Sequence, residues 1–207
     1  RWNPGKGRGF NPKVVTAGIR TLEGIPVKFG VEDSQVLPFF QKAAAYGFIP
    51  IGLHQHLGSG WVEGDFDAVA WAVDKMIEKA AELQAQGFRL DFLDFGGGFG
   101  PKYFSGQMLF PLEKYAALIG GRLRASGLSI PEIILEPGKY LTADAGVLLM
   151  RVEYVKQCYG NTFVCVNAGT FNTVPRPAIY TGAEHPVVNC AQVACAEPPD
   201  ITVAGNL

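Results

Sequence analysis

The sequence contains few cysteines and no closely spaced pair of them. The four cysteines are Cys158, Cys165, Cys190 and Cys195, and none of them forms a C-x-x-C motif. This spacing argues against a zinc site or a disulfide framework, because both depend on clustered cysteines. All four lie in apolar, strand-like segments, so we expect buried, reduced thiols.

An excess of charge and a long apolar run are also absent. The 207 residues carry a net charge of -1 and 18% of them are charged, so nothing favours nucleic acid or a membrane surface as a partner. No apolar run approaches the roughly 18 residues of a membrane span, and the amino end lacks the residue order of a signal peptide. We expect a cytoplasmic protein without nucleic-acid or membrane partners.

Apolar strands and amphipathic helices alternate in the first two thirds of the chain. The pattern predicts strands at 48–53, 90–95 and 132–136, and helices at 33–46, 66–83 and 111–125. In the long helix, Asp65 is expected to cap the start and Lys79 to lie on the polar face. Strands that recur at intervals of roughly forty residues are typical of β-loop-α units in a parallel sheet or barrel.

Beyond Gly138 the long helical patterns end and segments rich in β-branched residues begin. Strands are predicted at 146–156, 162–167, 186–193 and 201–204, with a turn at Tyr159-Gly160-Asn161. The sequence therefore predicts two domains, a partial α/β barrel at 1–145 and a partial all-β domain at 146–207. The boundary is placed at about residue 145.

Polar motifs follow each predicted strand of the first domain. The first strand is followed by His54 and His56, the second by Gly96, Gly97 and Gly98, and the third by Glu136, Pro137, Gly138 and Lys139. Because the carboxyl ends of parallel strands share one face, these motifs are expected to converge. Bare glycine amides can bind a phosphate, so a phosphate, an imidazole and a carboxylate would meet there.

Each motif also has a purely structural interpretation. The three glycines could form only a turn, and the histidines could be satisfied polar groups at a strand end, with the two imidazoles on opposite sides of the extended chain. Glu136 is harder to explain in that way, since a carboxylate that ends an apolar strand is costly to bury alone. Arg176 and Tyr180 lie in a loop of the second domain and could be a solvated cation and a packed ring.

A metal-dependent barrel hydrolase is one alternative function. His54 and His56 would then be metal ligands, but further histidines or acids are needed at later strand ends. The remaining histidine, His185, lies in the second domain. That class also has no use for three glycines in a phosphate-sized loop.

Four motifs together resemble one known family. In order, they are GLHQHLGSG at 52–60, LDFGGGFG at 93–100, EPGKYLTADAGVLLMRVEYVK at 136–156 and RPAIY at 176–180. They are similar to motifs of the pyridoxal-phosphate-dependent ornithine, diaminopimelate and arginine decarboxylases of the alanine-racemase-like fold, most of all the diaminopimelate branch. The resemblance implies the carboxyl-terminal half of a (β/α)8 barrel, the start of an all-β domain, and a homodimer when full length.

The resemblance also implies a role for each residue in the motifs. His56 would stack on the cofactor ring and Glu136 would bind the ring nitrogen, so these two are the expected catalytic residues. The cofactor phosphate would be bound by Ser59 and by the loops that hold Gly96, Gly97, Gly98, Pro137, Gly138 and Lys139. The distal carboxylate of an amino-acid substrate would be bound by Arg176, Tyr180 and Lys139. The implied reaction converts meso-diaminopimelate to L-lysine and carbon dioxide.

Two departures from the family pattern affect this expectation. The family usually carries arginine where this chain has Lys139, which cannot offer the same bidentate contact, so an ornithine or arginine decarboxylase remains an alternative. The family's cofactor-linking lysine has no counterpart in the chain. We therefore expect an internal fragment that is inactive alone, or else a catalytically dead relative.

Overall fold

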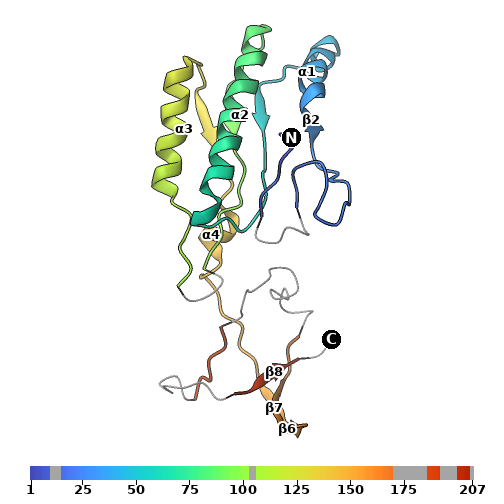
Figure 1. Ribbon diagram of the computed structural model, residues 1–207, viewed down its shortest axis with the longest axis vertical. Coiled ribbons are helices and arrows are strands. Elements are labelled where there is room, and N and C mark those ends of the chain that lie inside the picture. The colour runs from blue at the N-terminus through green and yellow to red at the C-terminus, as the bar shows by residue number, and fades with distance from the viewer. Residues whose placement is uncertain (10–14, 103–105, 170–185, 192–199, 206–207) are drawn as a thin grey trace. The chain divides into compact units, whose positions relative to one another are not determined.

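The chain folds into two units, Arg1–Asp144 and Ala145–Leu207, which are described separately. The computed structural model describes residues 1–9, 15–102, 106–169, 186–191 and 200–205 (Figure 1). Within these residues, no helix combines the length and the apolar character that crossing a membrane requires.

A three-stranded parallel sheet forms the centre of the first unit. Its strands are β3 (Gly52–His54), β4 (Phe92–Asp94) and β5 (Glu132–Ile134), in that spatial order. Gly52, Phe92 and Glu132 are partners in register, which confirms the prediction of parallel strands at intervals of about forty residues. Because the three strands are in register, their carboxyl ends lie at the same edge of the sheet.

Helices precede and connect these strands. They are α1 (Val36–Ala45), α2 (Phe66–Ala85) and α3 (Leu112–Ser126), and their axes run in similar directions in Figure 1. The first strand begins later than expected, at Gly52, because Pro50 has no N–H to donate to a ladder. The helix predicted at 33–46 starts with the 3-10 turn η1 (Asp33–Gln35) and continues as α1. Short elements that the sequence pattern did not predict are β1 (Trp2–Asn3), β2 (Val31–Glu32), η2 (Glu63–Asp65) and α4 (Gly138–Thr142).

The core lies between α2 and the sheet. The buried residues of α2 include Val73, Met76 and Leu83, which pack in one cluster with Leu53 of β3 and Leu93 of β4. The apolar stripe of α2 was therefore predicted correctly in its main positions. Burial of such side chains, at about 25 cal/mol per Å² of apolar surface, is the main force that holds helix and sheet together.

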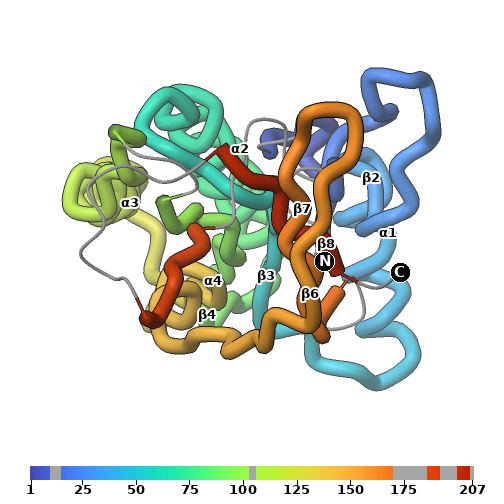
Figure 2. Tube along the Cα trace, turned by 90° about the horizontal axis from the view of Figure 1, so that it is seen from below, coloured from blue at the N-terminus to red at the C-terminus, as the bar shows by residue number. Residues whose placement is uncertain are grey.

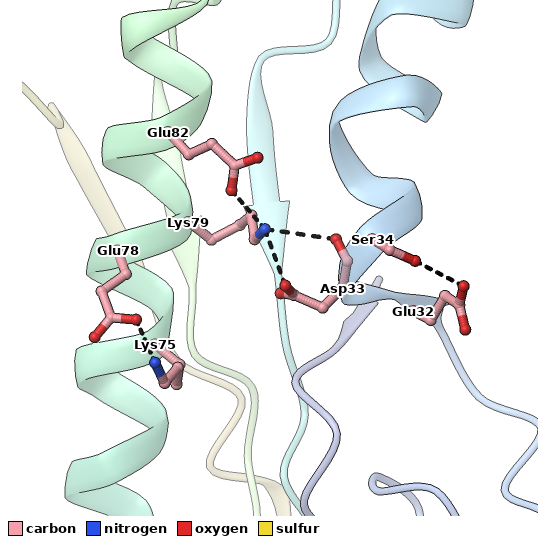
Figure 3. Close-up of polar contacts among 7 residues, drawn as sticks. All are labelled: Glu32, Asp33, Ser34, Lys75, Glu78, Lys79 and Glu82. Carbon is pink, nitrogen blue, oxygen red and sulfur yellow. Dashed lines mark hydrogen bonds and ion pairs between the residues drawn. The ribbon is translucent and has the colours of Figure 1, made fainter.

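Lys79 departs from the expected pattern of α2. It was placed on the polar face, but it is buried, and its ammonium donates hydrogen bonds to Glu82 at 2.6 Å and to the carboxylate of Asp33 at 3.2 Å (Figure 3). Burial alone would lower the pKa of Lys79, but these two hydrogen bonds outweigh it and raise the pKa. The charged ammonium of Lys79 thus connects α2 to η1 through its hydrogen bond to Asp33.

Asp65 does not cap α2 in the expected way. Its carboxylate accepts a hydrogen bond from the Val62 N–H at 3.0 Å and pairs with Arg8, and it makes no capping bond to α2. The reason is the extra turn η2, which places Asp65 at the third position of its own short helix.

The second unit contains a small sheet. The strands β6 (Val152–Cys158) and β7 (Asn161–Val166) form an antiparallel hairpin, and β8 (Thr202–Ala204) runs parallel to β7 (Figure 2). The turn at Tyr159 and Gly160 was predicted correctly, and both residues have positive φ, 49° and 82°. Two successive residues of this kind suit the twist of a tight hairpin.

Two strands predicted for this unit are not as expected. The strand predicted at 146–156 begins only at Val152, which is paired with Val166, the last residue of β7. Just beyond this point the Asn167 N–H donates to the Arg151 carbonyl, and the Arg151 N–H donates to the Asn167 side chain. Residues 186–191 form no strand, and the rest of that predicted segment lies outside the described residues. The prediction of buried cysteines was wrong: Cys158 is exposed like every other residue of β6, Cys190 is exposed in a turn, and Cys165 of β7 is only half-buried. Cys158, Cys165 and Cys190 are free thiols, as expected, and Cys195 lies outside the described residues.

Candidate functional site

Three polar side chains meet at the carboxyl edge of the β3-β4-β5 sheet. His54 ends β3, Asp94 ends β4, and Glu136 follows β5 after Leu135. His54 and Asp94 are partners in register, and Asp94 is paired in turn with Ile134. The in-register parallel strands therefore bring together residues about forty positions apart, which the sequence predicted for His54 and Glu136.

The two histidines face the same carboxylate. His54 Nε2 lies 3.8 Å from Glu136 Oε1, and His56 Nδ1 lies 3.8 Å from Glu136 Oε2. The expectation that the imidazoles point to opposite sides was wrong, because residues two apart on an extended chain share a face. Gln55 takes the other face, where it is buried and donates a hydrogen bond to the Ala72 carbonyl at 3.0 Å.

Both imidazoles are uncharged near neutral pH. Burial lowers the pKa of His56 to about 4, and the nearby Arg1 guanidinium and His54 add to this effect. Burial also lowers the pKa of His54, although Asp94 and Glu136 act in the opposite direction. The contacts with Glu136 are therefore those of a carboxylate with neutral rings.

Gly96, Gly97 and Gly98 lie against the neighbouring backbone. A Cβ on Gly97 would be 2.0 Å from the Glu136 carbonyl oxygen, and one on Gly96 would be 2.5 Å from that of Gln55. A Cβ on Gly98 would meet the Gly58 carbonyl oxygen at 2.5 Å. No real Cβ contact is that short, so the triple glycine is required for the close approach of the loops after β3 and β5. Sequence reasoning assigned these glycines only to phosphate binding or to a turn.

Two amides of the glycine loop donate to polar side chains of the site. The Gly96 N–H donates to Asp94 Oδ1 at 2.8 Å, and the Gly97 N–H donates to His56 Nδ1 at 3.4 Å. Because Nδ1 of a neutral imidazole can accept only when it carries no proton, this contact places the His56 proton on Nε2.

Ser59 and Lys139 form a second polar contact of the site. Lys139, in the short helix α4, places Nζ 2.5 Å from Ser59 Oγ. Gly138 begins α4 after Pro137, and no atom lies within 4 Å of the position that a Cβ on Gly138 would take. The structure thus brings together every predicted site residue of the first unit. Arg176 and Tyr180 lie outside the described residues.

Sequence reasoning missed two residues near the histidines. Arg1 Nη2 donates a hydrogen bond to the His56 carbonyl at 2.9 Å, and the neighbouring Trp2 forms a parallel bridge with Gln55. The other is Asp94, which was visible in the sequence as the residue directly before the glycine run at a strand end. Arg1 had no comparable signal, since its contact depends on the bridge between Trp2 and Gln55, the residue after β3.

The donor atoms of His54, Asp94 and Glu136 could also hold a metal ion. One ligand atom from each lies within 4.8 Å of the others. This set differs from the pair His54 and His56 considered from the sequence, because His56 is not part of it. A metal here would use the same carboxylate that faces the two imidazoles.

Comparison with known proteins decides between these classes. The family described as pyridoxal-dependent decarboxylase, pyridoxal binding domain, matches residues 14–143, which is more than half of the chain. This chain belongs to that family. The assignment argues against the metal-dependent hydrolase, since the residues that would bind a metal are those of a pyridoxal-binding domain.

Curated relatives of the chain are diaminopimelate decarboxylases. The enzyme of Methanothermobacter thermautotrophicus is 35% identical over 100% of this chain and 47% of its own length. That of Escherichia coli strain K12 is 33% identical over 89% of this chain and 42% of its length. The chain thus spans about half the length of the curated relatives it matches.

Solved structures show the same relationship. A crystal structure of a diaminopimelate decarboxylase has a TM-score of 0.80 and 30% identity, over 100% of this chain and 48% of that one. The Helicobacter pylori enzyme complexed with L-lysine has a TM-score of 0.72 and 32% identity, over 87% of this chain and 43% of its own. The fold of pyridoxal-phosphate-dependent decarboxylases, a barrel with a second sheet, is therefore the fold to which both units are similar.

Proposed function

We propose that the whole protein is a pyridoxal-phosphate-dependent carboxy-lyase that converts meso-diaminopimelate to L-lysine and carbon dioxide. The observation that carries this proposal is the meeting of His56, Glu136 and the glycine loop at one sheet edge, in a chain of the pyridoxal-binding family. The relatives named diaminopimelate decarboxylase, and the description of one of them as a complex with L-lysine, support this choice of substrate and product.

The residues at the sheet edge fit pyridoxal phosphate. The uncharged imidazole of His56 offers a flat face for an aromatic ring, and Glu136 offers a carboxylate for a protonated ring nitrogen. Ser59 and Lys139 offer a hydroxyl and an ammonium 2.5 Å apart for a phosphate, beside Gly138, where space is open. When bound, this cofactor supplies an electron sink for the electrons released by decarboxylation.

The residues of this chain would contribute binding, orientation and charge. Glu136 would accept a hydrogen bond from the ring nitrogen and so stabilise its protonated form. His56 would hold the ring from one face and leave the other face to the substrate. Gly96, Gly97 and Gly98 would let the loops approach closely enough for both contacts, and Pro137 would set the direction from Glu136 into α4.

Recognition of the substrate's far end is assigned to Arg176 and Tyr180. A guanidinium favours a distal carboxylate, as in diaminopimelate, over a distal amine, as in ornithine. Lys139 could also bind the substrate, but its contact with Ser59 favours a role in binding the cofactor phosphate. An ornithine or arginine decarboxylase is the second candidate, since Lys139 stands where the family usually has arginine.

We propose further that residues 1–145 are the carboxyl-terminal half of a (β/α)8 barrel and residues 146–207 the start of an all-β domain. The forty-residue register of β3, β4 and β5 supports a barrel segment. The whole protein would be a cytoplasmic homodimer with small-molecule partners and no nucleic-acid or membrane partner. The net charge of -1 on these 207 residues supports only the last part of this proposal, since it favours neither nucleic acid nor a membrane surface.

Carbon dioxide release by the full-length protein tests the proposal. The protein, loaded with pyridoxal phosphate and showing the visible absorbance of the bound cofactor, is supplied with meso-diaminopimelate, L-ornithine or L-arginine. We expect release from meso-diaminopimelate only. A flat cofactor spectrum would refute the cofactor assignment, and release from ornithine or arginine alone would favour the second candidate.

The variant Glu136→Gln tests the role of the carboxylate in the same assay. It should keep the cofactor and lose turnover by about a hundredfold or more, the range associated with loss of a proton-holding group. Glu132→Gln, at the exposed start of β5, is the matched control and should be unaffected. Equal turnover of the two variants would show that the role of Glu136 is misassigned.

A further inference from the structure

The two oxygens of the Glu136 carboxylate face two different imidazoles. Oε1 lies toward His54 Nε2 and Oε2 toward His56 Nδ1, each at 3.8 Å. The distances are equal, but the two ring nitrogens differ in their hydrogen bonds, since His56 Nδ1 has a partner and His54 Nε2 has none among the described residues. That difference decides which oxygen of Glu136 can accept a hydrogen bond from a histidine.

His56 cannot donate to Glu136 through the nitrogen that faces it. Its Nδ1 accepts the N–H of Gly97 at 3.4 Å, so the proton of this uncharged ring lies on Nε2. Oε2 therefore faces a nitrogen that offers it no hydrogen. This oxygen is left to accept a hydrogen bond from another donor.

His54 is in the opposite situation. Its Nε2 is buried and has no hydrogen-bond partner among the described residues, a costly state for a polar nitrogen. Glu136 Oε1 lies 3.8 Å from it, and a small movement would close this distance to hydrogen-bond length. Asp94 is also near, but its Oδ1 already accepts the N–H of Gly96. His54 is itself fixed by its place at the end of β3, in register with Asp94 of β4.

We propose that His54 is a positioning residue, which holds Glu136 Oε1 through its Nε2–H and so presents Oε2 to the nitrogen of the cofactor ring. This inference rests on the proposed function, and it gives His54 a role apart from stacking, which belongs to His56. His54 acts through Glu136 and does not itself touch the ring nitrogen. The HQH motif then supplies one histidine for the ring and one for its carboxylate partner.

The test measures protonation of the ring nitrogen in the full-length protein. Pyridoxal phosphate labelled with ¹⁵N in the ring is bound to the wild type and to variants, and its ¹⁵N chemical shift is followed against pH. The titratable and charged groups around His54 are Arg1, His56, Asp94 and Glu136, and only Glu136 is changed alongside it.

His54→Phe keeps a ring of similar shape but removes the donor. We expect it to lower the proton affinity of the ring nitrogen by about tenfold, the effect of one lost hydrogen bond to a charged group. His54→Gln retains a donor and should restore the wild-type shift. If His54→Phe does not fold, as judged by circular dichroism, His54→Leu takes its place.

A double-mutant cycle separates positioning from a general structural effect. Added to Glu136→Gln, the change His54→Phe should cause no further loss of proton affinity, because the group on which His54 acts is already gone. Additive losses, or an unchanged shift in His54→Phe alone, would overturn the inference. A wild type that binds no pyridoxal phosphate would instead refute the proposed function, so the two failures are distinguishable.

Discussion

Lys139 Nζ and Ser59 Oγ lie 2.5 Å apart although eighty positions separate them in the chain. Ser59 belongs to the loop after β3 and Lys139 to the helix after β5, so this contact joins the two outer strands of the sheet above its carboxyl edge. It pairs an ammonium group with a hydroxyl, a combination suited to a phosphate group.

Replacement of Lys139 should therefore weaken cofactor binding. In the full-length protein, Lys139→Ala should lower the affinity for pyridoxal phosphate by about tenfold, the effect of one lost charge-assisted hydrogen bond. Fluorescence titration of the apoprotein measures this affinity. Lys42→Ala, an exposed lysine of α1, is the control and should bind as the wild type does. An unchanged affinity combined with a raised KM would assign Lys139 to the substrate instead.

The buried imidazole of His56 predicts a stability that falls in acid. Its pKa is about 4 in the folded chain and about 6.5 without burial, so between these values the unfolded chain binds a proton that the folded chain does not. The contribution of His56 to the free energy of unfolding should therefore be constant above pH 7 and fall by about 1 kcal/mol between pH 7 and pH 5, which allows for solvent screening of a partly exposed ring. Chemical denaturation of the full-length apoprotein at the two pH values measures the change. His56→Gln should remove this part of the pH dependence, and an identical dependence in the variant would contradict the assignment.

A methyl group on Gly97 should destabilise the protein. It would be placed 2.0 Å from the Glu136 carbonyl oxygen, so the backbone must shift, at a cost of about 1–3 kcal/mol. Gly121→Ala is the matched control, because the residue is inside α3 and its added methyl group would have no atom within 4 Å apart from its chain neighbours and the backbone of its own helix. There the change should stabilise the helix by about 0.5–1 kcal/mol. Thermal unfolding measures the change in stability of each variant, which should be negative for the Gly97 variant and positive for Gly121→Ala. Equal changes in the two variants would argue against the close packing of the glycine loop.

Lys79 and Lys75 allow a comparison of a buried and an exposed ion pair on the same helix (Figure 3). The side chain of Lys79 is 9% exposed and that of Lys75, which pairs with Glu78, is 40% exposed. Lys75→Met should change the free energy of unfolding by less than about 0.5 kcal/mol, since exposed pairs contribute little. Lys79→Met should cost about 1 kcal/mol more, because two carboxylates lose their shared donor. Urea denaturation measures the difference, and a Lys79→Met variant as stable as Lys75→Met would contradict it.

The strand spacing and the polar residues at strand ends could be predicted because each depends on local pattern. The repeat of about forty residues fixes which positions end each strand, and parallel pairing then brings His56, Gly97 and Glu136 together. Tyr159 and Gly160 were likewise predicted as a turn from residue type alone.

Features that depend on distant contacts could not be predicted. Lys79 was expected to be exposed because only its own helix was considered, whereas its partner Asp33 lies 46 positions away. The contact of Arg1 with His56 depends on the bridge between Trp2 and Gln55, and no local pattern indicates that bridge. His54 and His56 are two positions apart on an extended chain, so the period of a strand is sufficient to predict that both imidazoles lie on the same face.

The close packing around Gly96, Gly97 and Gly98 bears on how such sequences are interpreted. Three carbonyl oxygens, of Gln55, Glu136 and Gly58, occupy the positions that side chains at these glycines would need. Selection on folding alone would therefore preserve the run, even in a descendant that has lost its cofactor and its chemistry. Among members of this family, an intact triple glycine is evidence that the two neighbouring loops are assembled, and evidence for catalysis has to come from His56, Glu136 and the residues that position them.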